Sequence, residues 1–266
     1  MMGAPSDPPH QYRPLWIAGA MRGRIRRDLE PAIAGLPELD LQELGWRLAE
    51  RGDSRSERSR LLQSAAQQLR KLGLIADWRN ERCAVLDEQG LELARCERGA
   101  FRTLGLQNRA VHINGYRPDG RLWIARRSQQ KRADPGKLDN LAAGGVSAGE
   151  SLKRAALREL WEEAGVPRHL AAKVDFPGMV IHSVRETQFG IHDERVIVAD
   201  IDLPASFTPE GRDGEVEEFL CMAPAEVMAA LAAGEFTIEA AMATRESLER
   251  RAAQGPHPSR GAAPIE

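Results

Sequence analysis

Three glutamates, Glu159, Glu162 and Glu163, have the spacing in this sequence that is most suited to chemistry. Positions i, i+3 and i+4 share one face of a helix, so the three carboxylates crowd together and repel one another. A hard divalent cation relieves that repulsion, and oxygen ligands suit Mg²⁺ or Mn²⁺. Arg158, one helical turn before Glu162, can hold that carboxylate in position. The spacing predicts a metal site for diphosphate chemistry, because Mg²⁺ typically binds carboxylates together with substrate phosphates.

The sequence around these glutamates predicts a tight loop followed by a helix. Ser151 is a suitable N-cap, and residues 152–163 are helix formers or neutral. Gly165 and Pro167 end the helix. The apolar residues on the opposite side of the helix are expected to face the core: Leu157, Leu160, Trp161 and Ala164. The alternative interpretation of such a charged helix is a solvated, salt-bridged face.

The stretch 144–166, GGVSAGESLKRAALRELWEEAGV, resembles position for position the signature of the Nudix hydrolases, G-x5-E-x7-R-E-U-x-E-E-x-G-U, in which U is apolar. The resemblance implies a Nudix α/β/α sandwich with a mixed sheet, and a hydrolase that cuts phosphoanhydride bonds with Mg²⁺ or Mn²⁺. It implies that the metal is held by the three glutamates and at Gly144. Glu150 is expected to anchor the loop or to ligate the metal through water.

A general base is needed if metal-bound hydroxide does not suffice, and in Nudix enzymes it is often a glutamate outside the signature. The candidates in this chain are Glu215, Glu217 and Glu218. We take Glu217 as the working choice and leave the other two open. On a regular strand, Glu215 and Glu217 share one face and Glu218 lies on the other. The alternative is that all three are surface charges.

Polar residues just before the signature are candidates for binding the substrate. Arg126, Arg127 and Lys137 can contact phosphate, although each one alone is more often a solvated cation. Asp139 and Asn140 are expected to brace the loop through side-chain to backbone hydrogen bonds. The family resemblance makes a substrate-binding role the alternative for these two residues.

Three shorter motifs resemble one branch of the Nudix family: WRNE at 78–81, HINGY at 112–116 and PGKLDNLAAGG at 135–145. Members of this branch carry an extra N-terminal domain, and some are fused to thiamin pyrophosphokinase. The branch implies action on thiamin diphosphate, especially its oxidised oxo and oxy forms, giving the monophosphate and phosphate. The alternative enzyme is a Nudix hydrolase of a nucleoside diphosphate derivative, such as ADP-ribose, NADH or a nucleotide sugar. A Nudix ligand sensor is a third alternative, and the intact signature argues against it.

The composition is that of a globular protein with more than one domain. The 266 residues are 42% hydrophobic and 29% charged, with a formal net charge of −2. Neither half is strongly basic, which excludes nucleic-acid binding through bulk electrostatics. No stretch approaches the roughly 18 apolar residues of a membrane helix, and the cysteines lack zinc spacing. We expect a cytoplasmic protein with a small-molecule diphosphate substrate and no nucleic-acid or membrane partner; a homodimer stays open.

The elements that position the signature predict an α+β fold. We expect a small N-terminal α+β domain over residues 1–105, a Nudix domain over 106–254 and a disordered tail over 255–266. The first domain is expected to contain helices over 36–50 and 59–72 and a hairpin of 83–86 with 91–94. The second domain is expected to form a mixed sheet covered by helices. Its strands are predicted over 110–116, 122–127, 179–184, 195–201 and 215–222, and its later helices from 224 and over 237–253.

Overall fold

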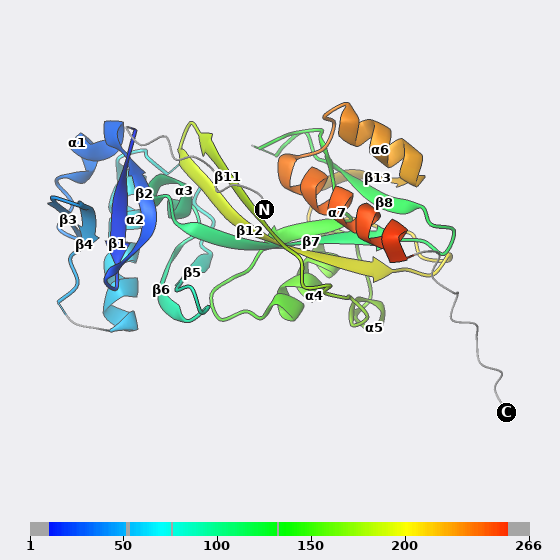
Figure 1. The fold of residues 1–266 in the computed structure, drawn as a ribbon, viewed down its shortest axis with the longest axis horizontal. Helices are drawn as coiled ribbons and strands as arrows, with labels where there is room; N and C mark the ends of the chain where they lie inside the picture. Colours follow the sequence, from blue (N-terminus) through cyan, green and yellow to red (C-terminus); the bar gives the residue numbers. More distant parts are fainter. Residues whose placement is uncertain (1–10, 52–53, 76, 132, 255–266) are drawn as a thin grey trace. The chain divides into compact units, whose positions relative to one another are not determined.

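The computed structural model describes residues 11–51, 54–75, 77–131 and 133–254 of the chain (Figure 1). The disordered tail expected over 255–266 lies outside the described residues. The chain divides into two compact units according to its internal contacts. The first unit comprises Met1–Arg109, Gly145–Glu150 and His182–Arg195, and the second comprises Ala110–Gly144, Ser151–Ile181 and Val196–Glu266.

A four-stranded sheet with strand order β2-β1-β4-β3 begins the first unit. Its strands are β1 (Tyr12–Ile17), β2 (Ala20–Arg26), β3 (Leu39–Gln42) and β4 (Gly45–Leu48). The helix expected over 36–50 is therefore wrong, since this segment forms the β3–β4 hairpin. Gly45 shows the physical reason. Its φ is +131°, outside the helical region, and a Cβ there would lie 2.5 Å from the carbonyl oxygen of Pro14 on β1.

A long helix and a second hairpin complete the core of the first unit. Helix α2 (Arg55–Lys71) is confirmed and begins earlier than expected, because Ser54 Oγ caps it by accepting a hydrogen bond from the backbone N of Glu57. Strands β5 (Arg82–Leu86) and β6 (Glu92–Glu97) form the expected hairpin. The shorter helices are α1 (Glu30–Ile33), which follows a 3-10 turn at Arg27–Leu29, and α3 (Ala100–Leu104). Trp46 and Leu62 are buried in the core that these elements share.

The second unit is built on a larger sheet with strand order β11-β12-β7-β8-β13, in which β10 also pairs with β7 and β9 with β8. Its strands are β7 (Gln107–Tyr116), β8 (Leu122–Arg127), β9 (Leu138–Asp139), β10 (Ala142–Gly145), β11 (Val180–Thr187), β12 (Gly190–Asp202) and β13 (Val216–Met222). Parts of β7, β11 and β12 belong to the first unit. All five of the strands expected here are confirmed, with bounds that differ by a few residues.

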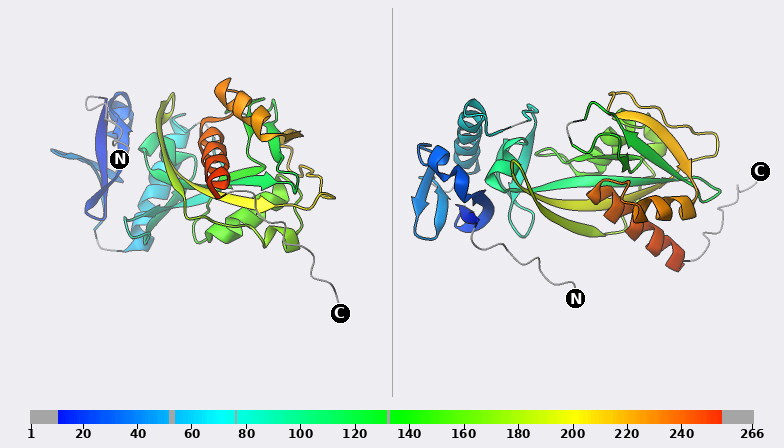
Figure 2. Two further views of the ribbon diagram at one scale, coloured as in Figure 1. Left: turned by 45° about the vertical axis from the view of Figure 1, so that its right-hand side comes forward. Right: turned by 90° about the horizontal axis from the view of Figure 1, so that it is seen from above.

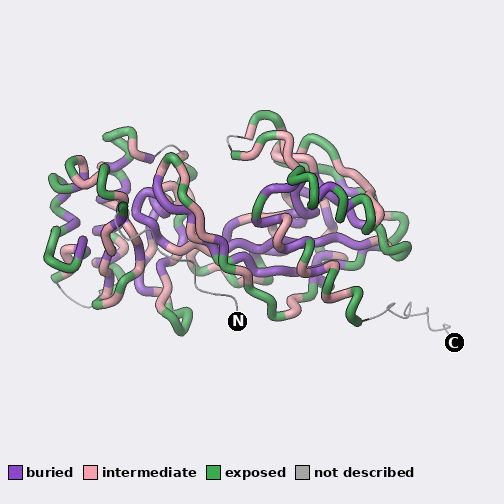
Figure 3. The backbone as a smooth tube through the Cα atoms, turned by 45° about the horizontal axis from the view of Figure 1, so that its top comes forward, coloured by how far each residue is buried: buried purple, intermediate pink, exposed green. Residues whose placement is uncertain are grey.

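Helices cover both faces of this sheet within the second unit. They are α4 (Leu152–Glu162), α5 (Arg168–Ala171), α6 (Pro224–Ala232) and α7 (Ile238–Gln254). Helices α4 and α5 lie on one face, and α6 and α7 lie on the other (Figure 1 and Figure 2). Figure 3 shows the central strands buried between these layers. The predicted α+β architecture is confirmed. In the described parts of the chain, no helix is long and apolar enough to span a membrane.

Buried polar groups fasten α7 to the sheet. Asp200 on β12, which is 2% exposed, accepts hydrogen bonds from Asn114 Nδ2 on β7 (3.1 Å) and from Ser247 Oγ on α7 (2.7 Å). Arg250 Nη2, one turn further along α7, donates to the same carboxylate (2.7 Å). The hydroxyl groups of Tyr116 and Ser247 share a further hydrogen bond of 2.7 Å. The buried charge of Asp200 is therefore compensated by several donors at once.

Replacing Asp200 by Ala is expected to destabilise the protein by about 3 kcal/mol, because the Arg250 guanidinium and the Ser247 hydroxyl lose a buried partner. Asp202→Ala is the matched control, since the Asp202 carboxylate is 70% exposed and lies 2.9 Å from Arg251. Its loss is expected to cost less than about 1 kcal/mol. Urea titration measures the free energy of unfolding of both variants. Equal losses would show that the buried network does not hold α7 to the sheet.

Candidate active site

Helix α4 presents the signature glutamates in two different environments. It begins at Ser151, whose Oγ accepts a hydrogen bond from the backbone N of Arg154 (3.3 Å), so the predicted helix and its N-cap are confirmed. Glu159 and Glu163 are buried, with exposed fractions of 7% and 8%. The Glu162 side chain is instead 46% exposed. The crowding that the spacing predicts therefore falls mainly on the buried pair.

The backbone of residues 143 and 144 lies directly against this buried pair. The N–H of Ala143 donates a hydrogen bond to Glu163 Oε2 (2.8 Å). A Cβ added at Gly144 would lie 1.9 Å from Glu159 Oε1, so only a glycine leaves room for that carboxylate. The sequence places Gly144 at the metal site, and the structure brings its backbone to the Glu159 carboxylate.

Arg158 bridges two of the signature carboxylates. Its Nη1 donates hydrogen bonds to Glu159 Oε1 (2.6 Å) and to Glu162 Oε2 (3.3 Å). The sequence predicts the contact with Glu162, and the structure adds the contact with Glu159. One guanidinium thus orients an exposed and a buried carboxylate and offsets part of the charge of the buried one.

Trp161 does not belong to the apolar core of the helix, so that expectation is wrong. Its side chain is 47% exposed, and the Arg212 guanidinium lies over its ring at 3.9 Å from the centroid. The buried arc of α4 includes Ala156, Glu159 and Leu160. Because this arc contains a carboxylate that faces the 143–144 backbone, it is rotated away from the arc that apolar residues alone predict, and Trp161 lies at its exposed edge.

Signature residues Gly145–Glu150 belong to the first unit, where they lie beside the β5–β6 hairpin. Ser147 Oγ donates a hydrogen bond to Glu81 Oε1 (2.8 Å), and Arg98 Nη1 donates to Glu81 Oε2 (2.9 Å). The backbone N of Ser147 donates to Glu150 Oε2 (3.2 Å). Glu150 therefore anchors its own loop, and Glu81 of the WRNE motif holds that loop from outside the signature.

A second acidic segment meets α4 at Glu163. Oxygen atoms of the Glu163, Asp213 and Glu215 carboxylates lie within 4.8 Å of one another. Lys131 contacts the Glu215 carboxylate. Sequence reasoning missed Asp213 and Lys131. Their signals are the acidic run GRDGEVEEF, of which only the glutamates were considered, and a lysine in the polar loop that precedes the signature.

The three candidate bases are placed differently by the structure. Strand β13 pairs with β8 through a register shift near its first residues, and this bulge breaks the simple alternation that a regular strand predicts. Glu215 lies in the group with Glu163. Glu217 instead accepts a hydrogen bond from Gln129 Nε2 (3.4 Å), and Glu218 pairs with an arginine of β8. A catalytic role for Glu217 stays a prediction.

The predicted phosphate-binding cations make hydrogen bonds within the protein. Arg126 Nε donates to Glu218 Oε1 (2.6 Å), and Arg127 Nη1 donates to Asp139 Oδ2 (2.8 Å). Lys137 Nζ lies 3.5 Å from a backbone carbonyl oxygen, to which it donates. A substrate phosphate would have to compete with these partners, and the phosphate-binding role of the three cations stays a prediction.

Asp139 and Asn140 brace the chain just before the signature. Asp139 Oδ1 accepts a hydrogen bond from the backbone N of Asn140 (2.9 Å), as expected of a bracing residue. Asn140 is 1% exposed, and its Nδ2 donates to Asn114 Oδ1 (2.7 Å) and to Thr244 Oγ1 (2.8 Å). Its Oδ1 lies 2.8 Å from His112 Nδ1. Asn140 therefore ties the signature to both β7 and α7, and its substrate-binding role stays a prediction.

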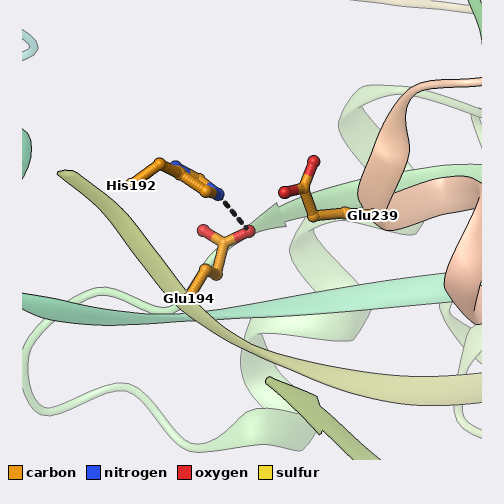
Figure 4. A group of neighbouring side chains, drawn as sticks. All are labelled: His192, Glu194 and Glu239. Atoms are coloured by element: carbon orange, nitrogen blue, oxygen red, sulfur yellow. Dashed lines mark ion pairs between the residues drawn. The ribbon is translucent and has the colours of Figure 1, made fainter. Parts of the chain in front are cut away.

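Strands β11 and β12 carry two histidine–carboxylate pairs in the first unit that sequence reasoning did not find. His182 Nε2 and Asp193 Oδ1 lie 2.9 Å apart. His192 Nε2 and Glu194 Oε2 lie 3.6 Å apart on the same strand (Figure 4). The signal in the sequence is the run His-Asp-Glu at 192–194, because alternate residues of a strand face opposite sides of the sheet.

The sequence profile of the NUDIX domain matches residues 106–243. The chain belongs to the Nudix family. Nudix hydrolase 24, chloroplastic, from Arabidopsis thaliana is 35% identical over 179 residues, which cover 66% of this chain and 49% of that protein. Nudix hydrolase 20, chloroplastic, from the same plant is 34% identical over 175 residues, which cover 64% and 46%. This chain spans about half the length of these curated relatives. The crystal structure of DR0079 from Deinococcus radiodurans aligns with a TM-score of 0.48 and 24% identity, over 62% of this chain and 98% of that one.

The residues of this Nudix site fit a divalent cation. Burial, followed by the neighbouring Glu159 carboxylate, raises the pKa of Glu163 well above its ordinary value. A cation counteracts both effects, because it stabilises the ionised carboxylate. The signature glutamates, together with Asp213 and Glu215, offer only oxygen ligands, which suit Mg²⁺ or Mn²⁺ rather than a metal that prefers nitrogen or sulfur.

Gly144→Ala is expected to weaken Mn²⁺ binding by roughly tenfold or more, the scale seen when the groups that position a metal ligand are removed. The reason is that the added Cβ displaces the Glu159 carboxylate. Gly35→Ala is the matched control, since a Cβ at Gly35 would meet no atom within 4 Å. Isothermal titration calorimetry with Mn²⁺ measures both variants. Unchanged affinity in the Gly144 variant would show that Glu159 does not hold the metal.

The raised pKa of Glu163 predicts a dependence of stability on pH in the absence of metal. The folded protein binds this proton more tightly than the unfolded chain, whose carboxyl titrates near 4.5. The stability of the metal-free protein therefore falls as the pH rises above that value towards the raised pKa. Because Glu163→Gln removes the ionisable group, its gain in melting temperature in EDTA is expected to grow from acid to neutral pH.

Glu162→Gln is the control for this measurement, because the Glu162 side chain is 46% exposed. Its effect on the melting temperature is expected to change less with pH than that of Glu163→Gln. A gain for Glu163→Gln that is the same at acid and neutral pH would contradict the expected burial of an ionised carboxylate.

Proposed function

We propose that this protein is a divalent-metal-dependent hydrolase that cuts a phosphoanhydride bond. The observation that carries the proposal is the group of Glu163, Asp213 and Glu215, whose carboxylate oxygens lie within 4.8 Å of one another at the end of the signature helix. Carboxylates and diphosphate oxygens are ligands that share a Mg²⁺ ion readily. When bound, such a cation neutralises the charge of the diphosphate and lowers the pKa of a coordinated water.

The residues of the chain contribute to the reaction in different ways. Glu159 and Glu163 hold their carboxylate oxygens on a rigid helix, and Arg158 orients the carboxylates at 159 and 162. Glu215 is the base candidate that the geometry favours, because its carboxylate lies beside Glu163 and is oriented by Lys131. Its oxygen would accept the proton of the attacking water. Glu217, the working choice from the sequence, is the alternative base.

We propose thiamin diphosphate, especially its oxidised oxo and oxy forms, as the substrate, with the monophosphate and phosphate as products. The support is the resemblance of three motifs to one Nudix branch. These motifs adjoin the signature: Glu81 of WRNE accepts a hydrogen bond from Ser147, and Asn140 of PGKLDNLAAGG donates one to Asn114 of HINGY. Their contacts position the signature loop and the strand before it, so the thiamin assignment depends on the resemblance rather than on a contact to the ring.

A nucleoside diphosphate derivative, such as ADP-ribose, NADH or a nucleotide sugar, is the second candidate substrate. The observation that favours it is that the acidic group at Glu163 serves any diphosphate and does not distinguish between organic groups. In this proposal, residues 1–105 form the domain that recognises the organic half of the substrate. A ligand sensor without catalysis is disfavoured, because the signature glutamates and Arg158 are all present.

Chromatographic detection of products tests the proposal, with Mg²⁺ and with thiamin diphosphate, its oxo and oxy derivatives, ADP-ribose and NADH as substrates. Hydrolysis of the thiamin compounds is expected to be the fastest. Glu162→Gln is expected to lower the rate roughly tenfold or more, because it alters a metal ligand.

Glu226→Gln is the matched control, since Glu226 accepts a hydrogen bond from the backbone N of Ala223 at the start of α6. It is expected to keep the wild-type rate. Faster hydrolysis of ADP-ribose or NADH would replace the substrate and keep the reaction class. Hydrolysis of none of these compounds would favour the ligand sensor.

A further inference from the structure

Trp161 and Arg212 make a contact that the Nudix signature itself does not require. Trp161 occupies the unconstrained position of R-E-U-x-E-E, and its side chain is 47% exposed. The Arg212 guanidinium carbon lies 3.9 Å from the centroid of its ring. A guanidinium over the face of an indole is attracted by the ring's quadrupole. The contact joins the outer side of α4 to the segment that precedes β13.

Backbone hydrogen bonds dock this segment on the C-terminal end of α4. Arg212 N donates to the carbonyl oxygen of Glu162 (3.0 Å), and Glu210 N donates to that of Ala164 (3.1 Å). Carbonyl groups in the last turn of a helix have no intrahelical donor, so they are free to accept these bonds. Gly165 allows the close approach, since its φ is +62° and a Cβ there would lie 2.8 Å from the carbonyl oxygen of Glu210.

The docked segment determines where the acidic group of the site is built. Asp213 follows Arg212 directly, and its Oδ1 accepts a hydrogen bond from the backbone N of Glu215 (2.9 Å). Ser128 N donates to the carbonyl oxygen of Glu215 (2.9 Å), and Lys131 contacts its carboxylate. The acidic turn 213–215 is therefore held at its end by the loop before the signature and at its start by the contact with α4.

Electrostatic repulsion acts against this arrangement when no cation is bound. The carboxylates at 213 and 215 lie within 4.8 Å of that of Glu163, and like charges at such distances repel one another. We propose that Arg212 and Trp161 are a positioning pair, which holds the acidic turn beside Glu163 so that a divalent cation meets a preformed set of ligands. This inference rests on the proposed function. The pair acts through Asp213 and Glu215 and touches neither substrate nor metal.

The direction of the effect separates positioning from simple charge. Arg212 is a cation near a cation site, so the loss of its charge alone would strengthen the binding of a divalent cation. The loss of a positioning contact would instead weaken it, because the binding energy then also has to order the turn. A weaker affinity after truncation of Arg212 therefore has the sign that only positioning predicts.

The chain offers a matched pair of the same chemistry. Arg70 lies over the ring of Trp78 at 4.6 Å from the centroid, in the first unit. Neither residue belongs to α4 or to the acidic turn. Truncation of Arg70 therefore removes an arginine–tryptophan stack and one positive charge without loosening the acidic turn.

Isothermal titration of the full chain with Mn²⁺, without substrate, tests the proposal, and the melting temperature reports folding. Arg212→Ala and Trp161→Ala are each expected to weaken Mn²⁺ binding roughly two- to fivefold, the ratio that corresponds to a cation–π contact at an exposed site. The double variant is expected to bind about as well as either single variant, because the two side chains act as one unit. Arg212→Lys and Trp161→Phe are expected to retain most of the affinity, and Arg70→Ala all of it.

An unchanged or stronger affinity in Arg212→Ala, at an unchanged melting temperature, would overturn the positioning pair. So would an equal loss in Arg70→Ala. If Trp161→Ala fails to fold, Arg212→Ala and Arg212→Lys still decide the question. Wild-type protein that binds Mn²⁺ but hydrolyses no diphosphate would overturn the proposed function alone, provided that Arg212→Ala still weakens binding. Normal hydrolysis with unchanged Mn²⁺ affinity in Arg212→Ala would overturn the positioning pair alone.

Discussion

The burial of two carboxylates on successive turns of one helix is the constraint on which the rest of the site depends. Glu159 and Glu163 are enclosed by α4 and by the backbone of residues 143–144. The N–H of Ala143 and the guanidinium of Arg158 compensate part of this charge. The remainder raises the pKa of Glu163, so the metal-free site is under electrostatic strain. A divalent cation relieves that strain, and affinity for metal thus follows from how the helix is packed.

Polar contacts outside the signature hold its loop and its neighbouring strands in place. In the first unit, Glu81 binds the Ser147 hydroxyl of the signature loop. In the second unit, Asn140 binds Asn114 on β7 and a threonine on α7. These residues lie in motifs that mark one branch of the family, yet their contacts are to other parts of the protein. The motifs therefore identify a scaffold, and selection of the organic half of a substrate has to come from other side chains.

The segment before β13 illustrates why the candidate base could not be chosen from the sequence. Alternation along a regular strand groups Glu215 with Glu217, but a register shift at the start of β13 removes that relation. The docking of residues 210–212 on the end of α4 then brings Asp213 and Glu215 together beside Glu163. A bulge and a helix-end contact are both products of long-range packing. Neither leaves a pattern in the local sequence that would predict it.

The sequence by itself determined the helix that carries the carboxylates, its N-cap at Ser151, the β5–β6 hairpin and the order of strands and helices. These features depend on interactions between residues that are close along the chain, so local spacing and turn residues are sufficient to predict them. Only the tertiary structure decided that 36–50 forms a hairpin, that Trp161 is exposed and that Asp213 joins the site. In each case the deciding contact comes from a distant segment: Pro14 against Gly45, the 143–144 backbone against α4, and residues 210–212 against the end of that helix.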